Sequence, residues 1–185
     1  MCLVGERLSD EIPAFDLNGN IPPVGIIRPT LRDFKTRFVD ESQNPAHRLT
    51  RFNGYLSYCN RISSLGITNV QWVDGSYTTN IPEPGDVDIL NHIDAVKLDQ
   101  KEDAMDVPFC DEFLNLCKDN ITKSLYYCHI QNLFVYPPNA DINKFATYLK
   151  QRRRCKRLFS QDKKHNPKGI IELNIPNGQH MIGNA

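Results

Sequence analysis

The chain has 185 residues and a mass of 21.2 kDa, a size that fits one domain with a hydrophobic core and is short for two. Its hydrophobic fraction of 40% and charged fraction of 24% are those of a globular protein and exclude a disordered or fibrous chain. Lysine plus arginine equals aspartate plus glutamate, at 22 each, so the net charge indicates no particular partner.

The first third of the chain predicts an extended arm followed by two helices. Residues 1–29 hold four prolines and a turn at residues 17–20, which indicates an irregular N-terminal arm. Thr30 can cap a short helix, with Asp33 placed to complete a capping box. The longest helix is predicted over residues 45–65, because apolar residues recur there at helical spacing between an Asn-Pro start and a Gly stop.

Two short strands follow, and we expect them to pair with each other. Residues 67–73 are rich in β-branched and aromatic side chains, and residues 86–90 alternate between polar and apolar side chains. The polar, proline-marked loop between them is too short for a helical crossover, so the pairing should be antiparallel.

The rest of the chain predicts two more helices and two more strands. A helix begins at Pro108, a β-type run covers residues 125–136, a helix capped by Asn139 or Asp141 follows, and a last strand over 168–173 is closed by a turn at 176–178. The second of these helices should direct three apolar residues inward: Ile142, Phe145 and Leu149. This order predicts an α+β fold, a mixed and mainly antiparallel sheet with helices packed on it, as one domain over residues 1–185.

The loop between the two paired strands carries the residues best suited to chemistry. Gly75 allows another group to approach the backbone closely, and Gly75 with Ser76 can offer N–H groups and a hydroxyl to phosphate oxygens. Asp86 and Asp88 are two apart on a strand, so their carboxylates should point to one face. Such a pair repels unless a cation lies between its members, and Mg²⁺ prefers oxygen ligands of this kind. The unit predicts half of a phosphoryl- or nucleotidyl-transfer site.

The spacing of these residues resembles the signature of a known superfamily. Gly-Ser, a spacer of nine residues and Asp-x-Asp are similar to the motif of DNA polymerase β-like nucleotidyltransferases. Either half of the motif is common by chance, so it is their coupling in one strand–turn–strand unit that carries information. More narrowly, four segments resemble a group of small bacterial nucleotidyltransferase-like proteins: residues 15–23, 72–76, 82–88 and 167–172. The resemblance implies a toxin–antitoxin or phage-defence setting.

The same resemblance implies a role for each site residue. Gly75 and Ser76 would hold a nucleoside triphosphate, and Asp86 and Asp88 would be the catalytic ligands of Mg²⁺ ions that bridge to it. The implied activity is transfer of an NMP group onto a protein or RNA hydroxyl. Lys168, within Pro-Lys-Gly, is the basic residue that we expect near the triphosphate, with a solvent-exposed strand start as its alternative.

The superfamily also needs a third carboxylate on a neighbouring strand, and here the chain departs from the pattern. Residues 125–136 contain no acid, and the aligned position is Gln131, whose amide cannot accept a proton at neutral pH. Asp74, Asp94 or Glu172 could supply the missing acid, and a substrate-bound partner is a further possible source. If none does, the resemblance implies a catalytically degenerate domain that serves as a nucleotide sensor or as a protein-binding, antitoxin-like module.

Charge is distributed unevenly along the chain. Residues 150–168 hold nine basic residues against one acid, Asp162, whereas residues 94–119 hold eight acids against three lysines. The basic segment predicts either a solvated helix face or a surface for an RNA acceptor or a protein partner. Five side chains would make these contacts: Arg152, Arg153, Arg154, Lys156 and Arg157. No aromatic residue interrupts the run before Phe159, so stacking of single-stranded bases is not indicated.

The cysteines and the N-terminal sequence favour a cytoplasmic protein. The six cysteines are scattered without a CxxC pair, which indicates reduced thiols rather than a disulfide scaffold or a zinc finger. No apolar run approaches the roughly 20 residues of a membrane-spanning helix, and residues 1–7 lack the pattern of a signal peptide. We expect His129 to be a packed or hydrogen-bonded histidine rather than a ligand, and Trp72 to be a core side chain.

Overall fold

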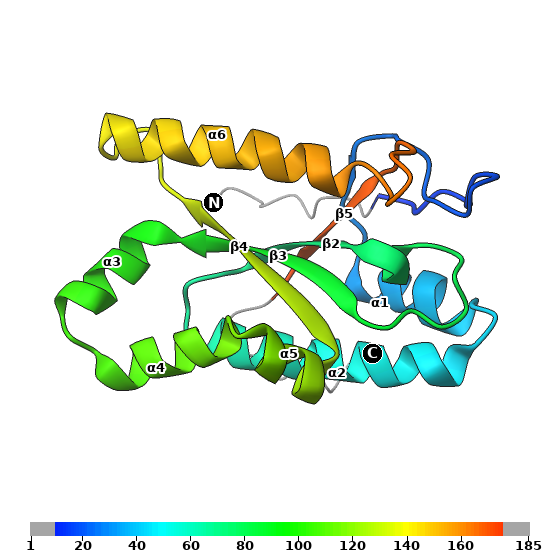
Figure 1. Cartoon of the computed structure of the whole chain (residues 1–185), viewed down its shortest axis with the longest axis horizontal. Helices are drawn as coiled ribbons and strands as arrows, with labels where there is room; N and C mark the ends of the chain where they lie inside the picture. Colours follow the sequence, from blue (N-terminus) through cyan, green and yellow to red (C-terminus); the bar gives the residue numbers. More distant parts are fainter. Residues whose placement is uncertain (1–9, 176–185) are drawn as a thin grey trace, which may run out of the picture.

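Apolar strands and amphipathic helices assemble into a mixed sheet with helices on both faces, shown in Figure 1 by a computed structural model that describes residues 10–175. The strands are β1 (Ile26–Ile27), β2 (Val70–Asp74), β3 (Val87–Asp94), β4 (Cys128–Val135) and β5 (Ile170–Asn174). Their order in the sheet is β1-β5-β2-β3-β4. β2 pairs antiparallel with β3 and β5, whereas β1 pairs parallel with β5, and β4 with β3. The predicted α+β class and the antiparallel pairing of the two central strands are confirmed.

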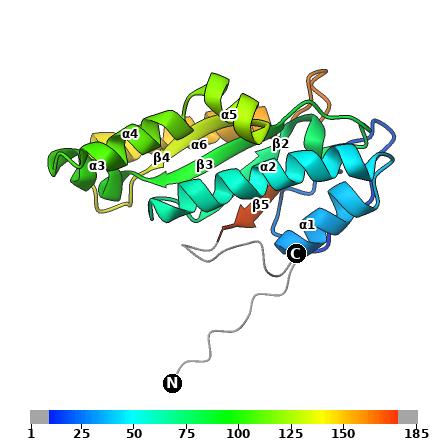
Figure 2. The ribbon, with the colours of Figure 1, turned by 90° about the horizontal axis from the view of Figure 1, so that it is seen from below.

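The helices form a layer on each side of the sheet. They are α1 (Leu31–Lys35), α2 (Pro45–Ser64), α3 (Ala95–Asp103), α4 (Val107–Leu116), α5 (Asp119–Tyr126) and α6 (Ile142–Phe159). A π-helical turn, η1 (Thr36–Asp40), continues α1, and a 3₁₀ turn, η2 (Gly75–Thr78), follows β2. Figures 1 and 2 show α6 over one face and α1, α2, α4 and α5 over the other. Within residues 10–175, no helix combines the length and the apolar character needed to cross a membrane.

The predicted caps account for where the first helices begin. Thr30 Oγ1 accepts a hydrogen bond from Asp33 N at 3.0 Å, and the Asp33 carboxylate accepts one from Thr30 N at 3.3 Å, so the capping box is formed. Asn44 caps α2 through its side chain, and Gly66 follows the helix with φ at +68°. The helix predicted over residues 45–65 is confirmed to within a residue.

Other boundaries differ from the prediction. Residues 125–127 belong to α5 and its left-handed cap, Tyr127 (φ +54°), so β4 begins only at Cys128. Ile142 is 72% exposed instead of facing inward, because it lies about 120° around α6 from the sheet-facing Tyr148. The predicted turn at residues 176–178 lies outside the described residues.

The sheet divides the core into two clusters. The larger cluster joins the sheet to α1, α2 and α4. The smaller one lies under α6 and has five buried members: Trp72, Leu90, Leu133, Phe159 and Ile170. Side chains two apart on a strand share a face, so Asp74 lies on the same face as Trp72, and Asp88 on the same face as Leu90. The two aspartates therefore sit at the margin of the smaller cluster, on the α6 side.

Candidate functional site

Three aspartates and a Gly-Ser turn lie where β2 ends and β3 begins. We call this place the β2–β3 corner and define it by five residues: Asp74, Gly75, Ser76, Asp86 and Asp88. Asp74, the last residue of β2, is the register partner of Asp88 in β3, and η2 starts at Gly75. The Gly-Ser turn and the strand that carries Asp88 therefore lie side by side.

Gly75 lies directly against the carboxylate of Asp88. Its φ angle is +76°, in the left-handed region that favours glycine. A Cβ atom at this position would overlap with the Oδ2 and Cγ atoms of Asp88. The conformation and the contact both require glycine, so the turn approaches Asp88 more closely than a residue with a side chain would permit.

Lys168 supports the corner from inside the protein. Its side chain is 3% exposed, and its ammonium pairs with Asp74 Oδ1 and donates to the Gly75 carbonyl at 3.3 Å. Burial raises the pKa of Asp74 to about 7, against the opposing effect of the Lys168 ammonium. The lysine does reach the turn, and the alternative of a solvent-exposed strand start is wrong. A phosphate could contact its ammonium only if the pair with Asp74 opened.

Asp162 stabilises the loop that precedes Lys168. Its carboxylate accepts hydrogen bonds from the backbone N–H groups of Lys164 at 2.8 Å and Asn166 at 2.9 Å. The same carboxylate accepts from the side chain of Asn20 at 3.0 Å, which ties the loop to the N-terminal arm. The bonds from the Asn20 and Asn166 side chains contribute most to lowering the pKa of Asp162. The single acid of the basic segment is thus a structural residue.

His129 contacts the carboxylate of Asp88. It is the register partner of Asp88 on β4, and its Nδ1 lies 2.7 Å from Asp88 Oδ1. Its Nε2 lies 3.5 Å from Asp119 Oδ2, so the imidazole stands between two carboxylates. The His129 side chain is 32% exposed. It is therefore an accessible partner of a candidate metal ligand, and the prediction of a packed or hydrogen-bonded histidine is confirmed by its contact with Asp88.

Asp86 and Ser76 complete the corner with less extensive contacts. Asp86 directly precedes β3 and is half-buried, as is Ser76. Burial raises the pKa of the Cys128 thiol, and the charges of Asp86 and Asp88 raise it further, so both carboxylates lie within electrostatic range of one thiol. The Ser76 carbonyl accepts from the Thr79 hydroxyl at 2.8 Å, which closes the turn.

Of the three acids of the chain proposed to replace the missing third carboxylate, only one lies beside Asp88. Gln131, the residue aligned with the third carboxylate of the superfamily, is the register partner of Leu90. The β4 residue opposite Asp88 is His129. The two oxygens of Glu172 accept from Arg28 Nε at 2.6 Å and from Trp72 Nε1 at 2.9 Å. Asp94 ends β3 six residues after Asp88, about 20 Å away along the strand. Asp74 alone of the three proposed substitutes lies beside Asp88.

The corner offers a partial donor set for Mg²⁺. Residues 10–175 contain no group of three or more His, Cys, Asp or Glu side chains arranged to hold a metal ion. Asp86 and Asp88 have suitable carboxylate oxygens, whereas Asp74 is paired with Lys168 and one oxygen of Asp88 with His129. This set fits a cation that arrives with phosphate oxygens and keeps water ligands, and it does not fit a cation held by the protein alone.

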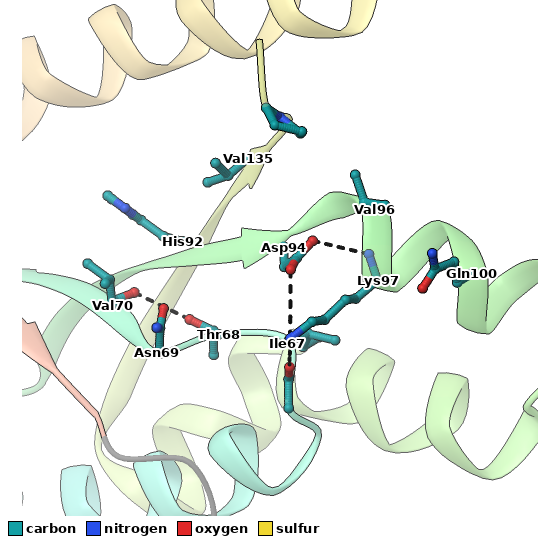
Figure 3. A pocket seen from close by; sticks show the side chains of 12 residues that line it. Ile67, Thr68, Asn69, Val70, His92, Asp94, Val96, Lys97, Gln100 and Val135 are labelled. Carbon is teal, nitrogen blue, oxygen red and sulfur yellow. Dashed lines mark hydrogen bonds and ion pairs between the residues drawn. The ribbon is translucent and has the colours of Figure 1, made fainter. Parts of the chain in front are cut away.

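A cavity of the described chain lies at the opposite end of the sheet. It has a volume of about 680 Å³ and is lined by the start of β2, the ends of β3 and β4, and α3. Figure 3 shows Asp94 and Lys97 beside each other there, 3.8 Å apart, with His92 pointing toward α6. The acidic oxygens near this cavity are engaged with Lys97, and the cavity lacks the glycine turn and carboxylate pair of the corner. Its size alone does not make it the better candidate.

Arg48 is a further residue of the site that the sequence pattern did not reveal. It is 1% exposed, and its guanidinium donates to the Tyr77 carbonyl at 2.7 Å and the Thr79 carbonyl at 2.7 Å. Two more bonds join it to the carbonyls of Phe38 at 2.9 Å and Ile81 at 2.8 Å. Arg48 thereby holds the loop after Ser76 against α2. Its spacing of four from Phe52, on the buried face of α2, was the available signal.

The fold and the corner define an α+β domain in which a glycine turn and strand carboxylates lie together at one end of two interior strands of a mixed sheet. Residues 13–174 match the family described as "Family of unknown function (DUF6932)", and the chain belongs to that family. Neither the curated proteins nor the solved structures contain a match to this chain.

Proposed function

We propose that the chain binds a Mg²⁺–nucleoside triphosphate at the β2–β3 corner and transfers an NMP group from it to a protein or RNA hydroxyl. The contact between Gly75 and Asp88 carries this proposal, because it places a backbone turn without a side chain against a strand carboxylate. Gly75 and Ser76 would contact the triphosphate, and Asp86 and Asp88 would hold the cation. The cation would neutralise the phosphate charge.

The other residues of the corner support this function by fixing its geometry. The buried pair of Lys168 and Asp74 is bonded to the Gly75 carbonyl, and Arg48 holds the residues after Ser76. A turn that is held from both sides does not need to reorganise when a ligand binds, and such preorganisation is what a charged transition state requires. We therefore assign Lys168 and Arg48 as positioning residues, and Asp74, held by Lys168, stays the candidate for the third carboxylate.

Transfer of label from an α-labelled NTP tests the enzymatic proposal. Wild-type protein should incorporate label into itself, a protein or RNA only when Mg²⁺ is present. Asp86→Asn should reduce incorporation at least about 100-fold, because the cation would lose one of its two carboxylates. Asp111→Asn, on the exposed surface of α4, is the matched control and should retain activity. Unchanged activity in Asp86→Asn would contradict the assignment.

A specific observation favours a second candidate, nucleotide binding without turnover. The β4 residue that faces Asp88 is His129, and β4 has no acid. The group that would activate an acceptor hydroxyl is then missing, whereas the groups for triphosphate and cation remain. In this case the protein would serve as a nucleotide sensor or as a protein-binding module.

Restoring an acid at the correct register position separates the two candidates. His129→Asp places a carboxylate opposite Asp88, whereas Gln131→Asp places one opposite Leu90 and is the control. A gain of turnover in His129→Asp alone would identify a degenerate enzyme. Calorimetry should show Mg²⁺–NTP binding to the wild type and no binding of Mg²⁺ alone. Absence of both binding and turnover would overturn both candidates.

A further inference from the structure

The C-terminal half of α6 gathers cations that have no acidic partner within residues 10–175. Six exposed side chains belong to this group: Lys150, Arg152, Arg153, Arg154, Lys156 and Arg157. Elsewhere basic residues are commonly paired, as Lys144 at the start of α6 is with Asp99 at 2.8 Å. The uncompensated charge is therefore concentrated on one stretch of helix.

Helical geometry divides these cations into two sets. Tyr148, Cys155 and Phe159 turn toward the sheet, where they join the smaller core cluster. At about 100° per residue, Arg152 and Lys156 lie within about 80° of that direction. The charge of Arg152 contributes to lowering the pKa of His92 on β3, after burial, which agrees with its placement on the sheet side.

The remaining four cations form a single outward-facing stripe. We call it the α6 stripe, and its members are Lys150, Arg153, Arg154 and Arg157. They stand at positions i, i+3, i+4 and i+7 and lie about 120–180° from the sheet-facing direction. Like charges at these spacings repel each other in a helix. The helix dipole compensates only the last turn, which includes Arg157. The positive charges of the stripe are therefore not neutralised by acidic side chains among the described residues.

We infer that the α6 stripe binds the phosphate backbone of double-stranded RNA. A protein interface of ordinary composition has an apolar or aromatic centre, whereas this stripe contains only cationic side chains. Single-stranded nucleic acid is bound largely by stacking on aromatic rings, and the stripe offers none. What remains is recognition of phosphates on a duplex.

The arrangement of the stripe favours an A-form duplex over B-form DNA. Lys150 and Arg154 form one row, and Arg153 and Arg157 form a second row about 60° away around the helix. Two adjacent rows of cations match the phosphates of two strands that face each other across a narrow groove. The major groove of A-form RNA is narrow and deep, whereas that of B-DNA is about 12 Å wide. This inference does not depend on the proposed nucleotide site.

Salt-dependent binding of a 20-base-pair RNA duplex tests the inference. Four phosphate contacts predict a slope of log K against log salt of about −3 to −4 for the wild type. Arg153→Gln/Arg154→Gln should lower affinity by about 10- to 100-fold and make the slope shallower by about 2. Lys150→Gln/Arg157→Gln, the other half of the stripe, should act in the same way.

The matched control removes the same charge from the other side of the same helix. Arg152→Gln/Lys156→Gln should change RNA affinity by less than about threefold, because these exposed side chains lie on the sheet-side flank of α6 and outside the stripe. Equal losses in the stripe and control variants would overturn the inference in favour of general charge attraction. Equal affinity for a DNA duplex or for single-stranded RNA would overturn the assignment to A-form RNA. Binding of polyglutamate without binding of RNA would instead identify an acidic protein partner.

Discussion

Gly75 has only a hydrogen atom at the point where any other residue would place its Cβ atom against Asp88. Gly75→Ala adds backbone strain at φ +76° and a clash with the Asp88 carboxylate. We expect a loss of about 1–3 kcal/mol in the free energy of unfolding. Because the clash displaces Asp88, we also expect at least a tenfold loss of Mg²⁺–NTP affinity, measured by calorimetry.

Gly66 provides the matched control for this substitution. It has a similar φ of +68°, but a Cβ atom there would meet no atom within 4 Å. Gly66→Ala should therefore show the strain alone, with nucleotide affinity unchanged. If the two variants lose nucleotide affinity equally, the contact between Gly75 and Asp88 has no special role.

Residue-level prediction placed partners that are close in sequence together, and of two distant partners it expected Lys168 near the turn but not His129 against Asp88. Gly75 and Asp88 are joined by a short loop, so the strand–turn–strand pattern was enough to place them together. Lys168 reaches Gly75 only because Asp162 folds the preceding loop against Asn20. His129 faces Asp88 through the parallel register of β3 and β4, which no local pattern specifies.

At the scale of elements, α2 supports the loop of the corner through one buried side chain. Arg48→Met keeps much of the apolar stem but leaves four carbonyl groups without the guanidinium. We expect a loss of about 3 kcal/mol or more in the free energy of unfolding, since each buried carbonyl without a partner is costly. Urea unfolding measures this loss.

The control for Arg48 lies one turn further along the same helix. Arg51 is half-buried and stacks over the Tyr127 ring at 4.9 Å, so Arg51→Met should cost about 1 kcal/mol or less. Arg48→Lys should not restore stability, because one ammonium cannot bond all four carbonyls. Equal stability of Arg48→Met and Arg51→Met would show that the loop does not depend on Arg48.

The elements that could be predicted are those with long periodic patterns or strong caps. α2 has both, and its bounds were predicted to within a residue. α3 follows β3 without a break, since Asp94 ends the strand and caps the helix, and only Ala95 and Leu98 are buried in it. α5 ends at the left-handed Tyr127 rather than at a glycine, so its stop signal is absent from the sequence.

For the whole molecule, the titration of His92 connects pH to stability. His92 packs edge-on against Trp72, with ring centroids 5.0 Å apart, and its Nε2 is buried without a hydrogen-bond partner among the described residues. Burial lowers the pKa of His92 to about 4, from an ordinary value of 6.5; the charge of Glu172 opposes this shift, and that of Arg152 adds to it. His92 therefore binds a proton more weakly in the folded protein than in the unfolded chain.

The sign of the pH dependence follows from this difference. Between pH 6.5 and about 4 the unfolded chain binds the proton and the folded protein does not, so the His92 contribution to stability is complete above pH 6.5 and is lost as the pH falls. The shift corresponds to about 3 kcal/mol across this window. His92→Phe keeps an aromatic ring beside Trp72 and removes the titrating group.

Urea unfolding at pH 4.5, 5.5 and 7 should therefore show a smaller loss of stability on acidification in His92→Phe than in the wild type. His165→Asn is the control, because it removes an exposed histidine at a left-handed position that asparagine tolerates. That variant should keep the wild-type pH dependence. Parallel curves for the wild type and His92→Phe would mean that His92 takes up its proton equally in the folded and unfolded states, and that its burial does not govern acid stability.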